Sequence, residues 1–107
     1  MRACDLINIK LMKAGGLGPA AQIAAMADAA GVGCMMGCML ESKVGITAAA
    51  ALSAGKAVIT KNDLDAADLM AADPVRGGIT YDKDHLVVPD APGLGITAIE
   101  GWQPLKD

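Results

Sequence analysis

Leu6-Ile7-Asn8-Ile9-Lys10 is a short apolar run that ends on a lysine, and the glycine-rich segment Leu11–Gly18 follows it. Such a run predicts a strand buried in a parallel sheet. Pro19 favours the first turn of a helix just beyond the loop, because its missing N–H costs nothing there. The order is therefore strand, loop and helix, with Lys10 at the carboxyl end of the strand.

The same order repeats twice along the chain. Gly31 and Gly55 are suited to end the first two helices, and Ser42 can cap the second. Alternating strands and helices predict an α/β fold made of right-handed β-α-β units around parallel strands. The predicted strands are Leu6–Lys10, Gly33–Leu40 and Ala57–Thr60, and the predicted helices are Ala20–Ala30, Lys43–Ala54 and Ala66–Ala72.

The last third of the chain has a different pattern. Gly78–Tyr81 and His85–Val88 flank Asp82-Lys83-Asp84, which predicts a β-hairpin. Pro92–Gly95 predicts an irregular turn, and the polar end, Gly101–Asp107, predicts a frayed tail.

Three such strands do not make a stable domain by themselves. Each looks buried on both faces, yet the pattern provides only three helices to cover them, and two sheet edges would stay open. The sequence therefore predicts part of a larger barrel or sheet. We expect the 107-residue chain alone to form oligomers or aggregates.

Composition excludes several classes of function. The net charge is −3 and the nine Lys and Arg residues are scattered, which argues against a nucleic-acid partner. No apolar run reaches the roughly 18 residues that a membrane span needs. The odd count of three cysteines predicts reduced, buried thiols, and with no apolar leader it favours a cytoplasmic location. The Cys34–Cys38 spacing, with no histidine nearby, is unlike a zinc site.

Four segments resemble the enolase superfamily, in its muconate-lactonizing subgroup and nearest to the dipeptide epimerases. The resemblance implies a partial (β/α) barrel over residues 1–76, containing barrel strands six to eight. It also implies a hairpin and a return segment over residues 77–107. The matching segments are Asp5–Gly16 for the sixth strand and its loop, Gly37–Ser42 for the seventh strand end, Asp63–Asp65 for the Asp-x-Asp motif after the eighth, and Pro92–Gly95 for the segment that leads back to the capping domain.

The resemblance implies removal of a proton from the carbon α to a carboxylate, with Mg²⁺ stabilising the resulting ene-diolate. Lys10 matches the base on the sixth strand. The opposite base, a Lys-x-Lys pair, and the three metal-binding carboxylates belong to earlier strands that this sequence does not include, so the chain alone would be inactive. From the residues alone, Lys10 is as well explained as a lysine whose amine reaches solvent at a strand end. Lys13 is expected to be structural or solvent-facing.

Asp63 and Asp65 have i, i+2 spacing in an extended segment, so their carboxylates point to the same side. The resemblance implies that they bind the free ammonium group of a dipeptide substrate. In the alternative, Asp65 caps the following helix and Asp63 is solvated. Glu41 either positions a neighbouring lysine or lines the substrate pocket, or it stabilises the amino terminus of the next helix.

Other functions stay open at this point. A muconate cycloisomerase or an o-succinylbenzoate synthase acts on substrates without an ammonium group, so the aspartate pair argues against both, whereas an N-acylamino acid racemase is a further relative. A non-catalytic module that binds an anion at Gly15–Gly18, or that self-assembles, is the alternative outside the superfamily. The full-length protein is expected to form a homo-oligomer.

Overall fold

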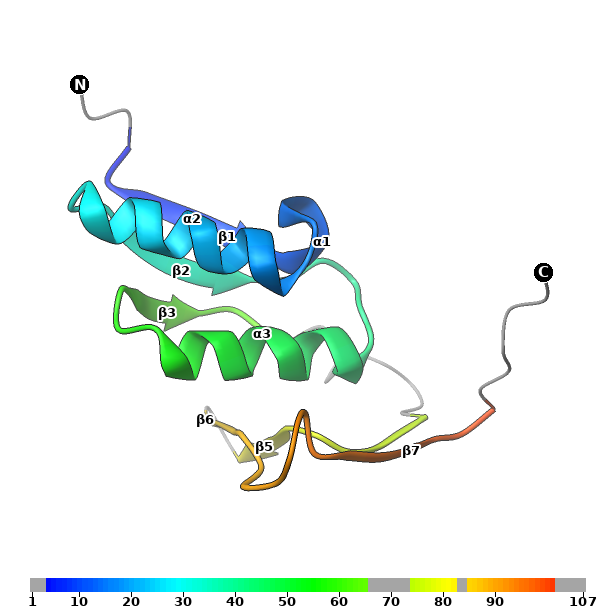
Figure 1. Cartoon of the computed structure of the whole chain (residues 1–107). Coiled ribbons are helices and arrows are strands. Elements are labelled where there is room, and N and C mark those ends of the chain that lie inside the picture. Colours follow the sequence, from blue (N-terminus) through cyan, green and yellow to red (C-terminus); the bar gives the residue numbers. More distant parts are fainter. Residues whose placement is uncertain (1–3, 66–73, 83–84, 102–107) are drawn as a thin grey trace.

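The computed structural model describes residues 4–65, 74–82 and 85–101. Two longer helices lie on one side of a three-stranded sheet, and two small antiparallel sheets lie below it (Figure 1). The predicted helix over Ala66–Ala72 falls outside the described residues. The elements are β1 (Leu6–Lys10), α1 (Leu11–Ala14), α2 (Leu17–Ala29), β2 (Gly33–Gly37), α3 (Lys43–Gly55), β3 (Ile59–Asn62), β4 (Val75–Gly77), β5 (Thr80–Asp82), β6 (His85–Val87) and β7 (Ile96–Ile99).

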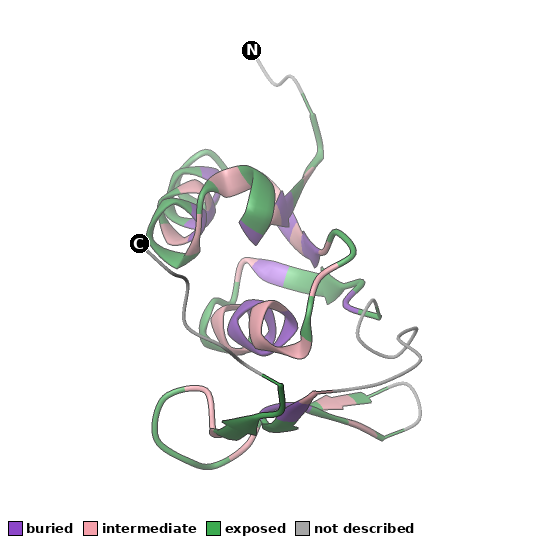
Figure 2. Cartoon of the chain, turned by 90° about the vertical axis from the view of Figure 1, so that its right-hand side faces the viewer, coloured by how far each residue is buried: buried purple, intermediate pink, exposed green. Residues whose placement is uncertain are grey.

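The main sheet is parallel and its strands lie in the order β1-β2-β3. In the register of this sheet, Lys10 pairs with Gly37, and Met36 pairs with Asn62. Helices α2 and α3 form the crossovers, and both cover the same face (Figure 2). The predicted fold of β-α-β units around parallel strands is confirmed.

The core lies between the sheet and these helices. It contains Ile9 from β1 and Met36 from β2, packed with small alanines of α2 such as Ala24 and with Ile46 of α3. All four side chains are at most 2 % exposed. Alanines on a helix let its backbone approach the sheet closely, which explains how a chain without phenylalanine builds a dense interior.

Strand β1 is not buried on both faces in this chain, and for this strand the prediction was wrong, whereas β2 has no exposed residue. Side chains alternate along β1, where Leu6 and Asn8 are exposed and Ile9 is buried. The apolar composition of these strands fits two covered faces, but this chain supplies side chains for only one. In a closed barrel the second face points inward and packs against the other strands.

Several element boundaries differ from the predicted ones. A helical turn, α1, occupies the segment expected to be loop, so Lys13 lies on a helix. Gly15 and Gly16 follow it with φ angles of 100° and 120°, which favour glycine. Helix α2 therefore begins at Leu17, and Pro19 still falls in its first turn. Strand β2 ends at Gly37 instead of Leu40, and β3 begins at Ile59 because residues 57–58 form a turn.

Ser42 occupies the N-cap position of α3, as predicted, but its side chain makes no capping hydrogen bond. The carboxylate of the preceding residue, Glu41, lies beside this turn instead. It accepts a hydrogen bond from the N–H of Met39 at 3.1 Å and contacts Gly45 in the first helical turn. A negative charge at this position complements the helix dipole.

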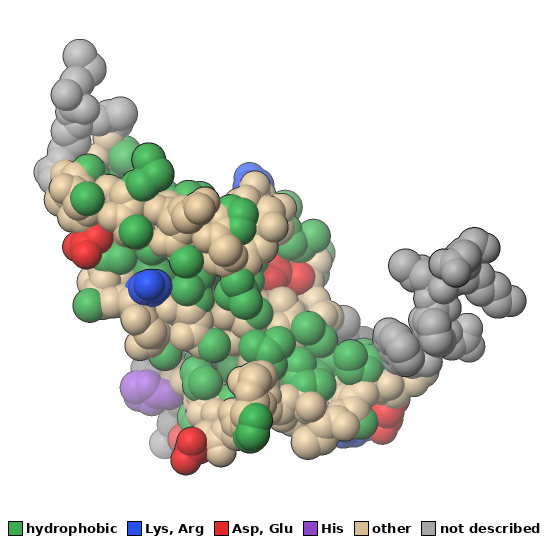
Figure 3. Space-filling view, in the orientation of Figure 1, with side chains coloured by type: hydrophobic (Ala, Val, Ile, Leu, Met, Phe, Trp, Pro, Cys, Tyr) green, Lys and Arg blue, Asp and Glu red, His purple; other side chains and the backbone are tan. Residues whose placement is uncertain are grey.

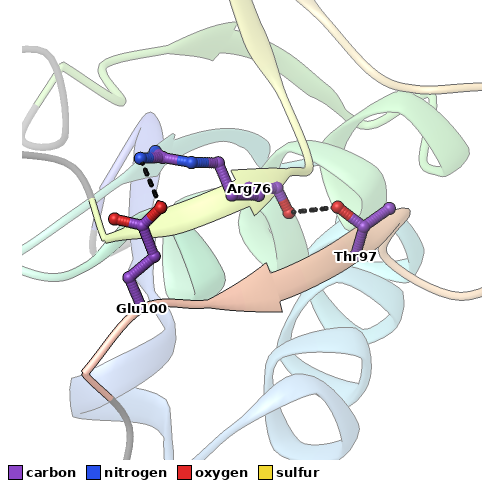
Figure 4. Close-up of polar contacts among 3 residues, drawn as sticks. All are labelled: Arg76, Thr97 and Glu100. Atoms are coloured by element: carbon purple, nitrogen blue, oxygen red, sulfur yellow. Dashed lines mark hydrogen bonds and ion pairs between the residues drawn. The ribbon is translucent and has the colours of Figure 1, made fainter.

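The predicted hairpin is confirmed, with Tyr81 of β5 paired to Leu86 of β6. The antiparallel pairing of β4 with β7 was not predicted. Figure 4 shows how Arg76 ties this second pair together: its guanidinium lies 2.8 Å from the Glu100 carboxylate, and its carbonyl accepts a 3.3 Å hydrogen bond from the Thr97 hydroxyl. The predicted boundary after residue 76 falls within β4.

The position of the histidine and the lengths of the helices complete the description of the fold. His85, the single histidine of the chain, lies at the surface (Figure 3). No helix among the described residues is long and apolar enough to cross a membrane.

The three cysteines have different environments, which corrects the expectation that all three are buried. Cys34 is fully buried, Cys38 is half-buried and Cys4 is exposed. Burial raises the pKa of the Cys34 thiol, and the nearby charges of Asp28 and Cys4 raise it further. Its reactive thiolate is therefore scarcer at a given pH than that of an ordinary cysteine.

Alkylation of the 107-residue chain with limiting iodoacetamide should follow this order. We expect Cys4 to be modified first and Cys34 last, and peptide mass spectrometry measures each rate. Because Cys34 is buried and its thiolate fraction is small, both slow its modification, and we expect its rate to be at least about tenfold below that of Cys4. Equal rates at all three cysteines would contradict the described packing, and the same experiment in urea provides the unfolded reference.

Candidate active site at the carboxyl end of the sheet

Lys10 is the last residue of β1 and lies at the carboxyl edge of the sheet. Ile9 faces the helices, so alternation along the strand places Lys10 on the opposite, open face. The Lys10 side chain is half-buried in this chain. In barrels of this type, chemistry takes place at the carboxyl ends of the strands.

Asp63 follows the end of β3 at the same edge. Its N–H donates a 2.8 Å hydrogen bond to the carbonyl of Met36, which is part of the parallel pairing of Met36 with Asn62. Extending this register by one residue beyond β3 puts Asp63 beside Gly37, which pairs with Lys10. The three residues form one row across the sheet, on the open face.

Gly37 stands between the two charged residues of this row. Neighbouring strands are about 4.8 Å apart, so the Lys10 and Asp63 backbones are separated by roughly 10 Å. Because residue 37 has no side chain, no group of its own stands between the amine and the carboxylate. The carboxamide of Asn8 lies beside Gly37 on this face, so close that a Cβ at position 37 would meet its Oδ1 at 2.5 Å.

Asp65 extends the acidic segment beyond the sheet. Leu64 is 3 % exposed, whereas Asp63 and Asp65 on either side are exposed. Alternation therefore directs the two aspartates away from the core together, as the i, i+2 spacing predicts. The structure brings Lys10 and Asp63 into one row. Asp65 lies two residues beyond Asp63, at the same end of the sheet.

Glu41 follows β2 at this edge, but its carboxylate is occupied by the loop before α3, where it contacts Met39 and Gly45. This geometry supports its alternative role at the helix terminus, and its place in a substrate pocket stays a prediction. Lys13, on α1, is exposed, in agreement with a solvent-facing role.

Three side chains to which the sequence analysis gave no role in the site hold the acidic segment. The Cys38 thiol lies 3.4 Å from the Asp63 carbonyl, and the Tyr81 hydroxyl donates a 2.6 Å hydrogen bond to the Leu64 carbonyl. Ser53 of α3 donates to the Asn62 Oδ1 at 2.5 Å. Tyr81 lies 17 residues from its partner, and no local pattern signals such a contact.

A metal site is not formed by the residues of this chain that the structure describes. Within residues 4–65, 74–82 and 85–101, no group of three or more His, Cys, Asp and Glu side chains is placed to hold an ion.

The comparisons with known proteins identify the class. The family described as enolase C-terminal domain-like matches residues 1–102, and the chain belongs to this family. The L-Ala-D/L-Glu epimerase of Clostridium acetobutylicum is 57% identical over 99 residues, which are 92% of this chain and 28% of that protein. The epimerase of the same name from Bacillus subtilis is 55% identical over 95 residues, which are 89% of this chain and 26% of that protein.

Solved structures show the same relationship. A substrate-liganded complex of the Bacillus subtilis L-Ala-D/L-Glu epimerase superimposes with a TM-score of 0.87 at 53% identity, over 90% of this chain and 27% of that one. A dipeptide epimerase from Methylococcus capsulatus, complexed with Mg and the dipeptide L-Arg-D-Lys, superimposes with a TM-score of 0.85 at 42% identity, over 88% of this chain and 27% of that one. The chain thus spans about a quarter of the length of the relatives that it matches.

Proposed function

We propose that this chain provides the carboxyl-terminal part of the barrel of a dipeptide epimerase. The observation that carries the proposal is the row formed by Lys10, Gly37 and Asp63 at the carboxyl end of the parallel sheet. It joins a potential base to a potential ammonium-binding carboxylate across a glycine, beside which the Asn8 carboxamide lies. The similarity to L-Ala-D/L-Glu epimerases over most of this chain supports the same function.

Lys10 serves as the base on one face of the substrate. Its neutral amine removes the proton from the carbon α to the substrate carboxylate, and its ammonium form returns a proton to the same face. Inversion needs a second base on the opposite face, which must come from another part of the barrel. This chain alone therefore does not epimerise.

Asp63 and Asp65 bind the free ammonium group at the amino end of the dipeptide. Two carboxylates fixed on one side of an extended segment suit a compact cation with several N–H donors. Their position relative to Lys10 orients the substrate so that its α-proton faces the amine. Substrates that lack an ammonium group leave this carboxylate pair unpaired, which disfavours them.

The cofactor in this proposal is Mg²⁺, and its ligands lie outside the described residues. Solved dipeptide epimerases that resemble this chain are complexes with Mg. When bound, the ion stabilises negative charge that develops on the substrate carboxylate.

A hybrid barrel tests the proposed function. This chain would replace the matching carboxyl-terminal segment of the Bacillus subtilis epimerase, and the hybrid would be incubated with L-Ala-L-Glu and Mg²⁺ in D₂O. We expect loss of the α-proton signal of the glutamate in the NMR spectrum, together with formation of the D epimer. The 107-residue chain alone should produce neither change.

Substrate competition separates the alternatives. The hybrid should turn over the dipeptide at least about 100-fold more efficiently than an N-acylated amino acid, because only the dipeptide pairs with Asp63 and Asp65. A folded hybrid that prefers the N-acylated substrate would replace the proposal with a racemase of that class. A folded hybrid that exchanges neither α-proton would contradict the proposed function altogether.

A further inference from the structure

The segment with the two aspartates is anchored by its backbone rather than by its carboxylates. The Asp63 N–H is held by the Met36 carbonyl at 2.8 Å. The Tyr81 hydroxyl holds the next carbonyl, that of Leu64, at 2.6 Å. Leu64 is also the buried residue between the two exposed aspartates, so this peptide decides where both carboxylates point.

The backbone just before Tyr81 is hydrogen-bonded to α3. Just before β5, the N–H of Ile79 donates a 3.1 Å hydrogen bond to the hydroxyl of Thr47, and both of these residues are fully buried. Gly78 has a φ of 74° and packs directly against the Thr47 hydroxyl. The start of the hairpin is therefore fixed to the helix, and β5 presents the tyrosine from a rigid base.

We propose that Tyr81 is a positioning residue that sets the selectivity of the site for substrates with a free ammonium group. Resting on the proposed function, this inference adds a connection from α3, through Thr47, Ile79 and Tyr81, to the carboxylates of Asp63 and Asp65. The hydroxyl does not touch the substrate. It acts by fixing the Leu64 carbonyl, and with it the direction of the aspartate on either side.

Replacing Tyr81 by phenylalanine in the hybrid barrel removes the hydroxyl and keeps the ring. Loss of one hydrogen bond at a binding segment corresponds to an increase of about fivefold to tenfold in the KM for L-Ala-L-Glu. The inhibition constant of N-propionyl-L-Glu, which has no ammonium group, should change less than about twofold, since it does not use the carboxylate pair. Circular dichroism checks the fold of each variant.

Thr97→Val is the matched control. It removes another hydroxyl that donates to a backbone carbonyl, that of Arg76, in the β4–β7 pair (Figure 4). We expect this variant to leave both constants unchanged. Equal losses for the dipeptide and for N-propionyl-L-Glu in Tyr81→Phe would show a general structural role and overturn the proposal, as would a KM that does not change.

Two more variants complete the test. If Tyr81→Phe does not fold, Cys38→Ala, which releases the Asp63 carbonyl, must show the same selective increase in KM, and its absence would overturn the proposal. Asp63→Asn with Asp65→Asn tests the proposed function separately. If this double variant keeps the preference for the dipeptide, the proposed function fails. If it loses the preference while Tyr81→Phe keeps it, only the role of Tyr81 fails.

Discussion

Replacing Lys10 by alanine in the hybrid barrel is expected to abolish epimerisation of the dipeptide while exchange of one of its two epimers continues. Loss of a general base lowers the rate by about 10²- to 10⁴-fold. The reason for the asymmetry is geometric. Lys10 is a single side chain at the end of one strand, so in the proposed function it serves only one face of the substrate carbon.

The epimer whose α-proton faces Lys10 should therefore stop exchanging in D₂O. The other epimer can still lose its proton to the opposite base and recover deuterium from it without inversion. Proton NMR of each pure epimer measures the two exchange rates separately. The unaltered hybrid should exchange both.

Lys13→Ala provides the control for this experiment, since Lys13 is exposed on α1 three residues further along the chain. We expect this variant to retain both exchange rates. If Lys10→Ala slowed both epimers equally, or left both unchanged, Lys10 would not be the base on one face. Equal slowing would instead indicate general damage to the site.

The sequence predicted those features that depend on local patterns. Strand β1 has the predicted bounds, Leu6–Lys10, because its apolar run is sharply limited by Asp5 and by the turn after Lys10. The hairpin pairing of Tyr81 with Leu86 follows from a short polar turn between two apolar segments. In both, the signal and the structure involve residues that are close in the chain.

Features that depend on distant contacts were missed. The pairing of Val75 with Ile99 joins residues 24 positions apart, and the bond from Tyr81 to the Leu64 carbonyl also closes a long loop. Burial was misjudged for a related reason. The apolar residues of a strand are suited to both of its faces in a whole barrel, whereas the described residues cover only the face toward the helices. The roles of Lys10, Asp63, Asp65 and Glu41 stay predictions, and the row across the sheet supports those of Lys10 and Asp63.

Replacing Gly37, the glycine between Lys10 and Asp63, is the second change expected to lower activity strongly. Gly37→Ala in the hybrid barrel should lower kcat/KM for L-Ala-L-Glu by about 100-fold, the loss that follows from displacing reacting groups by about 1 Å. The added methyl group would stand in the row itself. It would also meet the Asn8 Oδ1 at 2.5 Å, so the carboxamide must leave its place beside Gly37.

Stability should fall far less than activity. No positive φ is required at position 37, and the clashing atom belongs to the end of a side chain that can turn away. Gly33→Ala tests this argument on the same strand and face, at the opposite end of the sheet. A methyl there would meet Leu6 Cδ1 at 3.3 Å, so we expect nearly normal kcat/KM. Equal activity in the two variants would show that activity does not depend on the arrangement of Gly37 and the Asn8 carboxamide. That result would remove the structural basis for pairing Lys10 with Asp63 across it.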